Sequence, residues 1–380
     1  MKTVRFGMIG CGLMGREFAT AAARWAHLPE MDVRPELVAI CDTNDNLLKW
    51  YGDNFPAIEQ ITGDYEQLLA NDGVEAVYIA VPHHLHREMY CAAIGEGKHL
   101  LGEKPFGIDK PANEAISACV AEHPEVFVRC ASEFPFYPGV QRIGRMIEQE
   151  AFGRIIEVNS GFLHSSDLNP AKMINWKRMV DINGEYGCMG DLGMHICHVP
   201  FRAGWIPRNV RAILSDIVHQ RPGASGKMVP CETWENATLL CDVVDPMCGE
   251  PFPMTLRTQR VKPGETNTWY LEVYGTKASA RFSTKNPRRL DLLEYDGGEQ
   301  VWGRIDTGHE TAIKSITGGI FEFGFSDAIL QMWGAFLHEM EHGSPVSKFA
   351  GCVKSEEVAV SHRLFTAALE SQKNGTVVSV

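Results

Sequence analysis

The sequence has no run of 18 uninterrupted apolar residues, no excess of positive charge and no internal repeat. A membrane-spanning helix needs about 20 apolar residues in succession, so we expect none here. The 36 Lys and Arg residues are outnumbered by 48 Asp and Glu residues, which gives a formal net charge of −12. A nucleic-acid-binding protein carries a basic surface that meets the phosphate backbone. We therefore expect neither a membrane nor a nucleic acid as a partner.

The sequence also lacks any CxxC pair, although it contains 11 cysteines. Their odd number and scattered positions argue against a disulfide framework, and the missing pair argues against a zinc ribbon. The chain opens on the strand-like segment 3–9 rather than on a charged stretch followed by an apolar one, so we expect no signal peptide. Reduced, partly buried thiols are typical of a cytoplasmic protein, which is the predicted location.

One metal-binding pattern is present. His338 and His342 match HExxH, which in zinc proteases places two histidine ligands on one face of a helix. Gly343 and Pro345 end the helix directly after the second histidine. A catalytic zinc also needs a third ligand and an open coordination position. We interpret the pattern as a helix C-terminus, where histidine favours the helix dipole, and predict no metal.

A length of 380 residues indicates about two domains. Over residues 1–134, short continuous apolar runs alternate with helical patterns. Such alternation is typical of a parallel sheet covered on both faces, so we predict an α/β domain with a Rossmann arrangement. The predicted strands are 4–9, 37–41, 76–81, 99–102 and 126–130, and the predicted helices are 13–25, 65–70, 87–95 and 111–123.

After Phe134 the pattern changes to alternating, half-exposed strands, and we predict a second, α+β domain over residues 135–380. The predicted strands are 155–162, 237–243, 254–259, 268–274 and 279–282, the predicted helices are 140–150, 328–342 and 355–373, and the predicted loops are 220–230 and 245–253. The strand 269–274 carries apolar residues on both sides, so we expect the sheet to pair with another subunit in a homodimer or homotetramer.

Gly10, Gly12 and Gly15 form a GxGxxG motif between the first strand and the first helix, a context typical of dinucleotide binding. Asp42 ends the second strand and is placed to accept hydrogen bonds from the ribose hydroxyls of NAD. It follows the glycines at more than the usual ~20 residues, which an inserted loop at 27–36 would explain. No Arg or Lys follows Asp42 closely to receive a 2′-phosphate, so NAD is favoured over NADP.

Three further motifs follow in order: Glu103-Lys104-Pro105, Asp191 to His195 as DxGxH, and Gly275-Thr276. Together with the glycine motif they closely resemble the Gfo/Idh/MocA family of oxidoreductases over nearly the whole chain. The resemblance implies a C-terminal domain built on a large open, mainly antiparallel sheet. The expected NAD contacts are Gly10, Cys11, Gly12, Leu13, Met14, Gly15, Asp42, Val81, Pro82, His83, His86, Glu103 and Lys104.

The resemblance also implies catalytic roles. Lys104 is expected between cofactor and substrate, His195 as the general base, and Asp191 as the residue that binds substrate and orients the site. Alcohol oxidation needs a base near neutrality and a cation beside the developing alkoxide, so these residue types suit the chemistry. The family usually carries a basic residue after the fifth strand, whereas this chain has Glu133 followed by Phe134, so contacts there must differ.

A second polar cluster is predicted to form a substrate wall, with Trp176 as a platform for a sugar. The other expected substrate contacts, two of which are also catalytic residues, are Tyr137, His164, Asp167, Lys172, Lys177, Arg178, Asp191 and His195. The predicted function is NAD-dependent oxidation of a secondary hydroxyl of a sugar, polyol or glycoside. The alternative is an NAD-dependent glycoside hydrolase that oxidises C3 transiently, for which His83, Tyr137, His164 and Asp167 are surplus groups.

Overall fold

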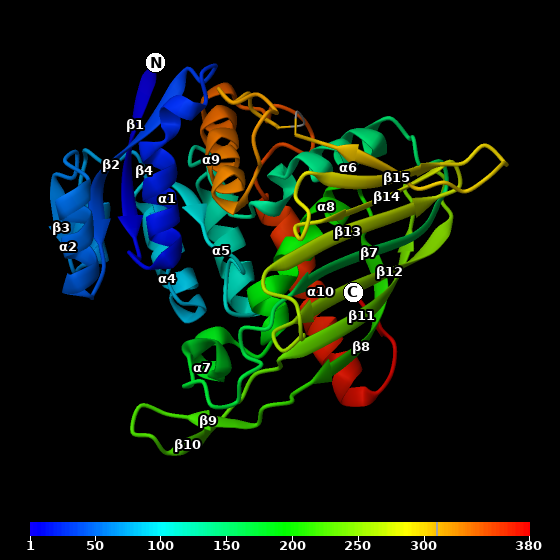
Figure 1. The fold of residues 1–380 in the computed structure, drawn as a ribbon. Coiled ribbons are helices and arrows are strands. Elements are labelled where there is room, and N and C mark those ends of the chain that lie inside the picture. Colours follow the sequence, from blue (N-terminus) through cyan, green and yellow to red (C-terminus); the bar gives the residue numbers. More distant parts are fainter. Residues whose placement is uncertain (309–310) are drawn as a thin grey trace.

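The computed structural model describes residues 1–308 and 311–380, and its N-terminal part is built on a six-stranded parallel sheet (Figure 1). The strand order is β3-β2-β1-β4-β5-β6. Strands β2 and β3 are added on one side of β1, and β4, β5 and β6 on the other, as in a dinucleotide-binding fold. The predicted Rossmann arrangement is confirmed. The strands are β1 (Lys2–Ile9), β2 (Val33–Cys41), β3 (Gln60–Thr62), β4 (Ala76–Ile79), β5 (His99–Gly102) and β6 (Val128–Cys130).

Helices cover both faces of this sheet. On one face Phe6 and Phe18 pack on Trp333, with ring centroids 5.3 and 4.0 Å from the indole. On the other face Val77 and Ile79 share a buried cluster with Tyr90. The helices are α1 (Leu13–Ala23), η1 (Trp25–His27), α2 (Asp45–Asn54), α3 (Tyr65–Leu69), η2 (His83–Leu85), α4 (His86–Gly95), α5 (Lys110–Glu122) and α9 (Phe325–His342).

Helix α9 lies far along the chain yet covers the N-terminal sheet beside α1 (Figure 1). Its Trp333 and Phe336 fill the space over β1, and Arg24 pairs with Asp327 at 2.7 Å. The boundary at residue 134 stays a prediction. The return of α9 means that residues on both sides of that boundary build one core.

The C-terminal part contains a nine-stranded sheet in the order β16-β15-β14-β13-β7-β12-β11-β8-β17, antiparallel except where β7 meets β12. The predicted large, open, mainly antiparallel sheet is confirmed. Helices cover its inner face, and the outer face is open (Figure 1). Its strands are β7 (Ile155–Leu163), β8 (Pro207–Ser215), β11 (Asn236–Val244), β12 (Pro251–Gln259), β13 (Thr268–Gly275), β14 (Ala278–Ser283), β15 (Arg289–Glu294), β16 (Gly303–Asp306) and β17 (Val378–Ser379).

The remaining elements connect this sheet to the rest of the chain. They are η3 (Phe134–Phe136), α6 (Pro138–Glu148), η4 (Trp176–Arg178), α7 (Val180–Asn183), the π-helical turn η5 (Met189–Gly193), α8 (Met194–Arg202), β9 (Gln220–Pro222), β10 (Met228–Pro230) and α10 (Ser355–Asn374). Over residues 1–308 and 311–380, no helix combines the length and apolarity that crossing a membrane requires.

Two predicted loops were wrong. The segment 27–36 is not an inserted loop, because β2 begins at Val33 and pairs with β1 from Lys2 onward. Pro35 is tolerated in this strand because β3 pairs only with residues 39–41, so one edge of β2 is free at the proline. The long spacing to Asp42 comes from η1 and the length of β2. The segment 220–230 contains the short antiparallel pair β9 and β10.

Candidate active site

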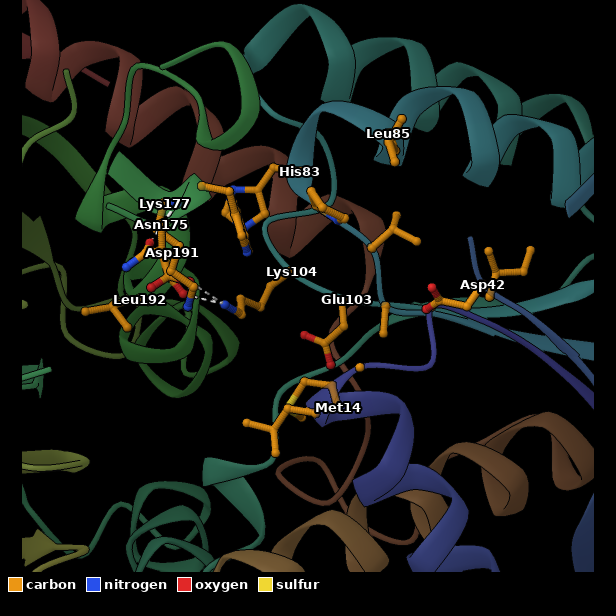
Figure 2. Close-up of a pocket in the computed structure, with 18 of the residues that line it drawn as sticks. Met14, Asp42, His83, Leu85, Glu103, Lys104, Asn175, Lys177, Asp191 and Leu192 are labelled. Carbon is orange, nitrogen blue, oxygen red and sulfur yellow. Dashed lines mark hydrogen bonds and ion pairs between the residues drawn. The ribbon is translucent and has the colours of Figure 1, made fainter. Parts of the chain in front are cut away.

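A cavity of about 810 Å³ lies where the carboxyl ends of the parallel strands meet the second sheet (Figure 2). One end is lined by Gly10, Gly12 and Asp42, and the other by Lys104, Asp191 and His195. The crevice at the carboxyl ends of such strands is where α/β proteins bind ligands. The cavity therefore joins the predicted cofactor loop to the predicted catalytic groups.

The glycine motif forms a cradle that side chains would close. Gly10 has a φ of +95°, and a Cβ there would lie 2.3 Å from the carbonyl oxygen of Ala80. A Cβ on Gly15 would lie 2.4 Å from the carbonyl oxygen of Gly10. A Cβ on Gly12, in contrast, would meet nothing within 4 Å and would project into the open cavity. The free N-terminus of α1 follows directly, so the loop fits a pyrophosphate.

Asp42 is fixed at the end of β2 by two backbone donors. Its Oδ2 accepts from the N–H of Cys11 at 2.7 Å, and its Oδ1 accepts from the N–H of Asn44 at 2.8 Å. Each oxygen keeps a further lone pair for a ribose hydroxyl. The described cavity lining carries its basic residues at Lys104, Lys172, Lys177 and Arg260, away from this end. The residues present thus fit NAD.

Asp42→Ala is expected to weaken NAD binding by at least about tenfold, because two hydrogen bonds from ribose hydroxyls to a carboxylate are lost. Isothermal titration of the variant with NAD and NADP measures the effect. Asp45→Ala is the matched control, since Asp45 lies in the first turn of α2 outside the cavity lining. Binding of NADP by the unmodified protein as tight as that of NAD would contradict the assignment.

Three cations meet the Asp191 carboxylate. Lys104 Nζ donates to the Asp191 carbonyl at 2.6 Å and to its Oδ1 at 3.2 Å, as the dashed lines in Figure 2 show. Lys177 Nζ donates to the same Oδ1 at 2.9 Å, and the Arg260 guanidinium binds Oδ2. Burial lowers the pKa of Lys104 from its usual value, and burial together with the charges of Arg260 and Lys104 lowers that of Lys177 further. Asp191 therefore holds two lysines and one arginine together at the cavity wall.

His195 stands at the start of α8, just after the π-helical turn that carries Asp191. Its Nδ1 is 3.0 Å from Ser132 Oγ, and its ring packs edge-on against Phe134 and Phe162. Burial, followed by the charge of Lys104, holds the pKa of His195 well below its usual value. The imidazole is consequently neutral near pH 7 and free to accept a proton.

Most of the predicted site residues line the cavity. In chain order these are Gly10, Gly12, Leu13, Met14, Asp42, Val81, Pro82, His83, Glu103, Lys104, His164, Lys172, Trp176, Lys177, Asp191 and His195. Within the described residues, the cavity lining does not include Cys11, Gly15, His86, Tyr137, Asp167 or Arg178. Cys11, Gly15 and His86 are buried.

The other three residues are engaged elsewhere. The Arg178 side chain is fully buried, 2.9 Å from Asp216 and 3.4 Å from Glu235. Asp167 is buried beneath Lys172, to which it is bonded at 3.0 Å. Tyr137 packs in an aromatic cluster against Phe282 and Phe323. The structure thus keeps these three behind the cavity wall.

Several cavity residues were missed from the sequence. Arg260 reaches Asp191 from the end of β12, and no local pattern distinguishes it from any other arginine after a strand. Glu133 does have a signal, because it stands where the resembled family carries a basic residue. The remaining missed residues include Asn175, Asn267, Phe162, Leu192 and Phe325.

The histidines of the HExxH pattern lie far from this cavity lining. Their ring centroids are 4.5 Å apart on α9, and His342 Nε2 is 3.3 Å from Asp32 Oδ1. Helix α9 ends at Gly343 in the left-handed conformation. Within residues 1–308 and 311–380, no group of three His, Cys, Asp or Glu side chains is arranged to hold a metal ion.

A dinucleotide cradle joined to a Lys–Asp–His cluster is the arrangement of a pyridine-nucleotide oxidoreductase. Residues 4–129 match the family model described as "Oxidoreductase family, NAD-binding Rossmann fold". The predicted resemblance to the Gfo/Idh/MocA oxidoreductases is thereby confirmed, and NAD is the cofactor of this domain.

Known proteins resemble the chain well beyond this domain. The levoglucosan dehydrogenase of Pseudarthrobacter phenanthrenivorans is 25% identical over 311 residues, which cover 77% of this chain and 76% of that protein. The glucose-6-phosphate 3-dehydrogenase of Bacillus subtilis is 24% identical over 301 residues, covering 76% and 77%. A solved levoglucosan dehydrogenase, in complex with NADH and L-sorbose, superposes with a TM-score of 0.87 at 22% identity and covers 100% of this chain and 99% of that one. The whole chain therefore shares its fold.

Proposed function

We propose that the protein is an NAD-dependent dehydrogenase that oxidises a secondary hydroxyl of a sugar, polyol or glycoside. The observation that carries the proposal is the convergence of Lys104, Asp191 and His195 on the cavity whose far end is the glycine cradle. Relatives named for levoglucosan and for C3 oxidation of glucose 6-phosphate support a carbohydrate substrate. Lys104, Asp191 and His195 are the residues we assign to catalysis.

Bound NAD would supply the hydride acceptor, held by the glycine loop and Asp42. His195 takes the proton of the reacting hydroxyl, because its neutral imidazole lines the cavity. The Lys104 ammonium stabilises the oxygen as negative charge develops on it. Asp191 holds Lys104 and Lys177 in place, and we expect its carboxylate to accept hydrogen bonds from further substrate hydroxyls. Trp176 and Lys177 form the adjacent wall.

His83 contacts Trp176 in the substrate wall. His83 Nδ1 lies 2.9 Å from the Asn183 carbonyl oxygen, and its ring meets Trp176 edge-on with centroids 4.9 Å apart. Burial holds the pKa of His83 well below its usual value, so the ring is neutral and its Nδ1–H can donate to that carbonyl. We infer that His83 orients Trp176 for stacking on a sugar ring.

The proposal is tested by mixing the protein with NAD and a panel of free sugars, polyols, sugar phosphates and aryl glycosides. NADH absorbance and release of the aryl group are recorded in the same samples. We expect NADH to accumulate with at least one sugar and to match the keto product one to one. Aglycone release without lasting NADH would instead identify a redox-neutral hydrolase.

Glycoside hydrolysis is the second candidate, and His164 is the observation that favours it. His164 lines the cavity against Phe162, with ring centroids 4.8 Å apart. Burial and the charge of Arg260 lower its pKa to about 4, so it is a second neutral base in the site. His164→Ala discriminates: a dehydrogenase loses mainly substrate affinity, whereas a hydrolase keeps a transient NADH signal and stops releasing aglycone.

We propose that the outer face of the nine-stranded sheet pairs two copies of the chain. Ile213 and Leu240 are 63% and 52% exposed on neighbouring strands of that face. Light scattering after size-exclusion chromatography at micromolar concentration is expected to give a dimer or tetramer. Replacing both side chains with aspartate should shift the mass towards one chain. A single-chain mass for the unmodified protein would contradict this expectation.

A further inference from the structure

Glu133 places a carboxyl group in the cavity next to the proposed base. It follows β6, is 5% exposed, and lines the cavity together with Glu103 and Lys104. Its Oε2 lies 4.0 Å from Nδ1 of His195. Within the part of the chain that the structure describes, no other carboxylate forms an ion pair with this imidazole, and the Glu133 carboxyl makes no side-chain hydrogen bond. Apart from a hydrogen bond to its own backbone, the Glu133 carboxyl therefore has His195 as its one ion-pair neighbour among the described residues.

His195 needs such a partner once it carries a proton. Its surroundings are positive or apolar: Lys104 and Lys177 repel an imidazolium, and the rings of Phe134 and Phe162 cannot solvate one. A buried, unpaired charge is strongly disfavoured. Because Nδ1 faces Ser132 and Glu133, Nε2 is the nitrogen left for the substrate. A negative group beside Nδ1 would offset the cost of protonating Nε2.

We propose that Glu133 is a positioning residue that, together with the Ser132 hydroxyl, orients His195 and stabilises the imidazolium formed when the substrate hydroxyl gives up its proton. The proton moves from the hydroxyl to Nε2, the Nδ1–H stays hydrogen-bonded to Ser132 Oγ, and Glu133 remains ionised throughout. The proton then leaves from Nε2 to solvent or product. This inference rests on the proposed function, because it assigns a proton-holding role to the same His195.

The proposal ties activity to the ionisation of Glu133. Burial, followed by the charge of Glu103, raises the pKa of Glu133 to about 8. Two other charged groups act on the Glu133 carboxyl. The positive charge of Lys104 favours its ionised form, and the negative charge of Glu17 disfavours that form. Because the useful form is the carboxylate, kcat/KM should rise with pH through a midpoint near 8 and level off above it. His195 itself stays neutral over this range and adds no step.

The test compares Glu133→Gln and Glu133→Asp with the unmodified protein over pH 6 to 9. Glutamine keeps the shape and removes the charge, so kcat should fall roughly 10–100-fold, the effect of losing a group that orients a histidine. The step near pH 8 should disappear, while the Kd for NAD stays within about twofold. Aspartate restores the charge, so the step should return with an intermediate rate. Glu122→Gln, a matched change at the exposed end of α5 outside the cavity lining, should keep the step unchanged.

A second readout does not depend on turnover. The His195 ring signals are followed by NMR from pH 6 to 9 in the NAD-bound protein. They should shift with a midpoint near pH 8 as Glu133 ionises beside Nδ1, and Glu133→Gln should abolish this shift. An unchanged titration, or a Glu133→Gln protein that keeps both its rate and its pH step, would overturn the role of Glu133. If the unmodified protein reduces no NAD with any sugar, the proposed function fails instead, and the titration still decides whether Glu133 supports the charge on His195.

Discussion

His195→Ala is expected to lower kcat by roughly 10²–10⁴-fold, the contribution of a positioned general base. Without the imidazole the proposed base is gone, and the positive charge of Lys104, which also lines the cavity, disfavours a proton held there. The Kd for NAD should change less than about threefold, because His195 lies on α8 whereas the glycine cradle and Asp42 belong to the first sheet. Steady-state kinetics and NAD titration of the same preparation measure both quantities.

Two controls make this result specific. His195→Gln keeps a hydrogen-bonding side chain between Phe134 and Phe162 and should be as inactive as the alanine variant. His338→Ala removes a half-buried histidine from α9, outside the cavity lining, and should retain normal turnover. Loss of a general base lowers kcat at least roughly 100-fold. A His195→Ala protein that retains more than about a tenth of normal kcat would therefore contradict the assignment.

Lys104→Ala is expected to lower kcat/KM by roughly 10²–10³-fold, comparable to the loss of one donor to a developing oxyanion. Both kcat and KM should worsen, because the ammonium contacts the hydroxyl in the bound state and in the transition state. Asp191 keeps Lys177 and Arg260 as partners, so the cavity wall should survive the substitution. Circular dichroism and the thermal midpoint should therefore stay close to those of the unmodified protein.

Lys110→Ala is the matched control, since Lys110 pairs only with Glu114 at 3.4 Å on the exposed side of α5 among the described residues. Its kinetics should be unchanged. A Lys104→Ala protein that loses only substrate affinity and keeps its kcat would mean that Lys104 binds in the ground state alone. That outcome would remove Lys104 from the catalytic step, and the developing negative charge would then be stabilised by another group.

The first sheet was predictable because its strands are buried on both faces. Continuous apolar runs such as residues 76–79 and 99–102 become β4 and β5. The glycine motif was predictable because a Cβ on Gly10 or Gly15 would collide with a backbone oxygen. The short β3 and the helix α2 were not predicted, since three residues carry little pattern and α2 buries only Leu48 and Tyr51. Local pattern fails where an element is short or mostly exposed.

The residues that line the candidate site were predictable where motifs carry them and unpredictable where tertiary contacts bring them together. Lys104, Asp191 and His195 come from segments far apart in the chain, yet each belongs to a recognisable motif. Arg260 joins them only through the pairing of β12 with β7, a register that the sequence does not display. Arg178 was expected in the substrate wall for the same reason, because nothing local indicates that it is buried beside Asp216 and Glu235.

The most direct test of the central claim is the fate of the hydrogen on the oxidised carbon. A sugar from the panel is prepared with deuterium at that carbon and incubated with the protein and NAD, and the nucleotide is analysed by mass spectrometry. The account predicts one deuterium on every NADH formed and an equal amount of keto product. The His195→Ala variant should form neither the labelled NADH nor the keto product. NADH without deuterium, or deuterium that returns to the sugar while an aglycone is released, would contradict net oxidation by hydride transfer.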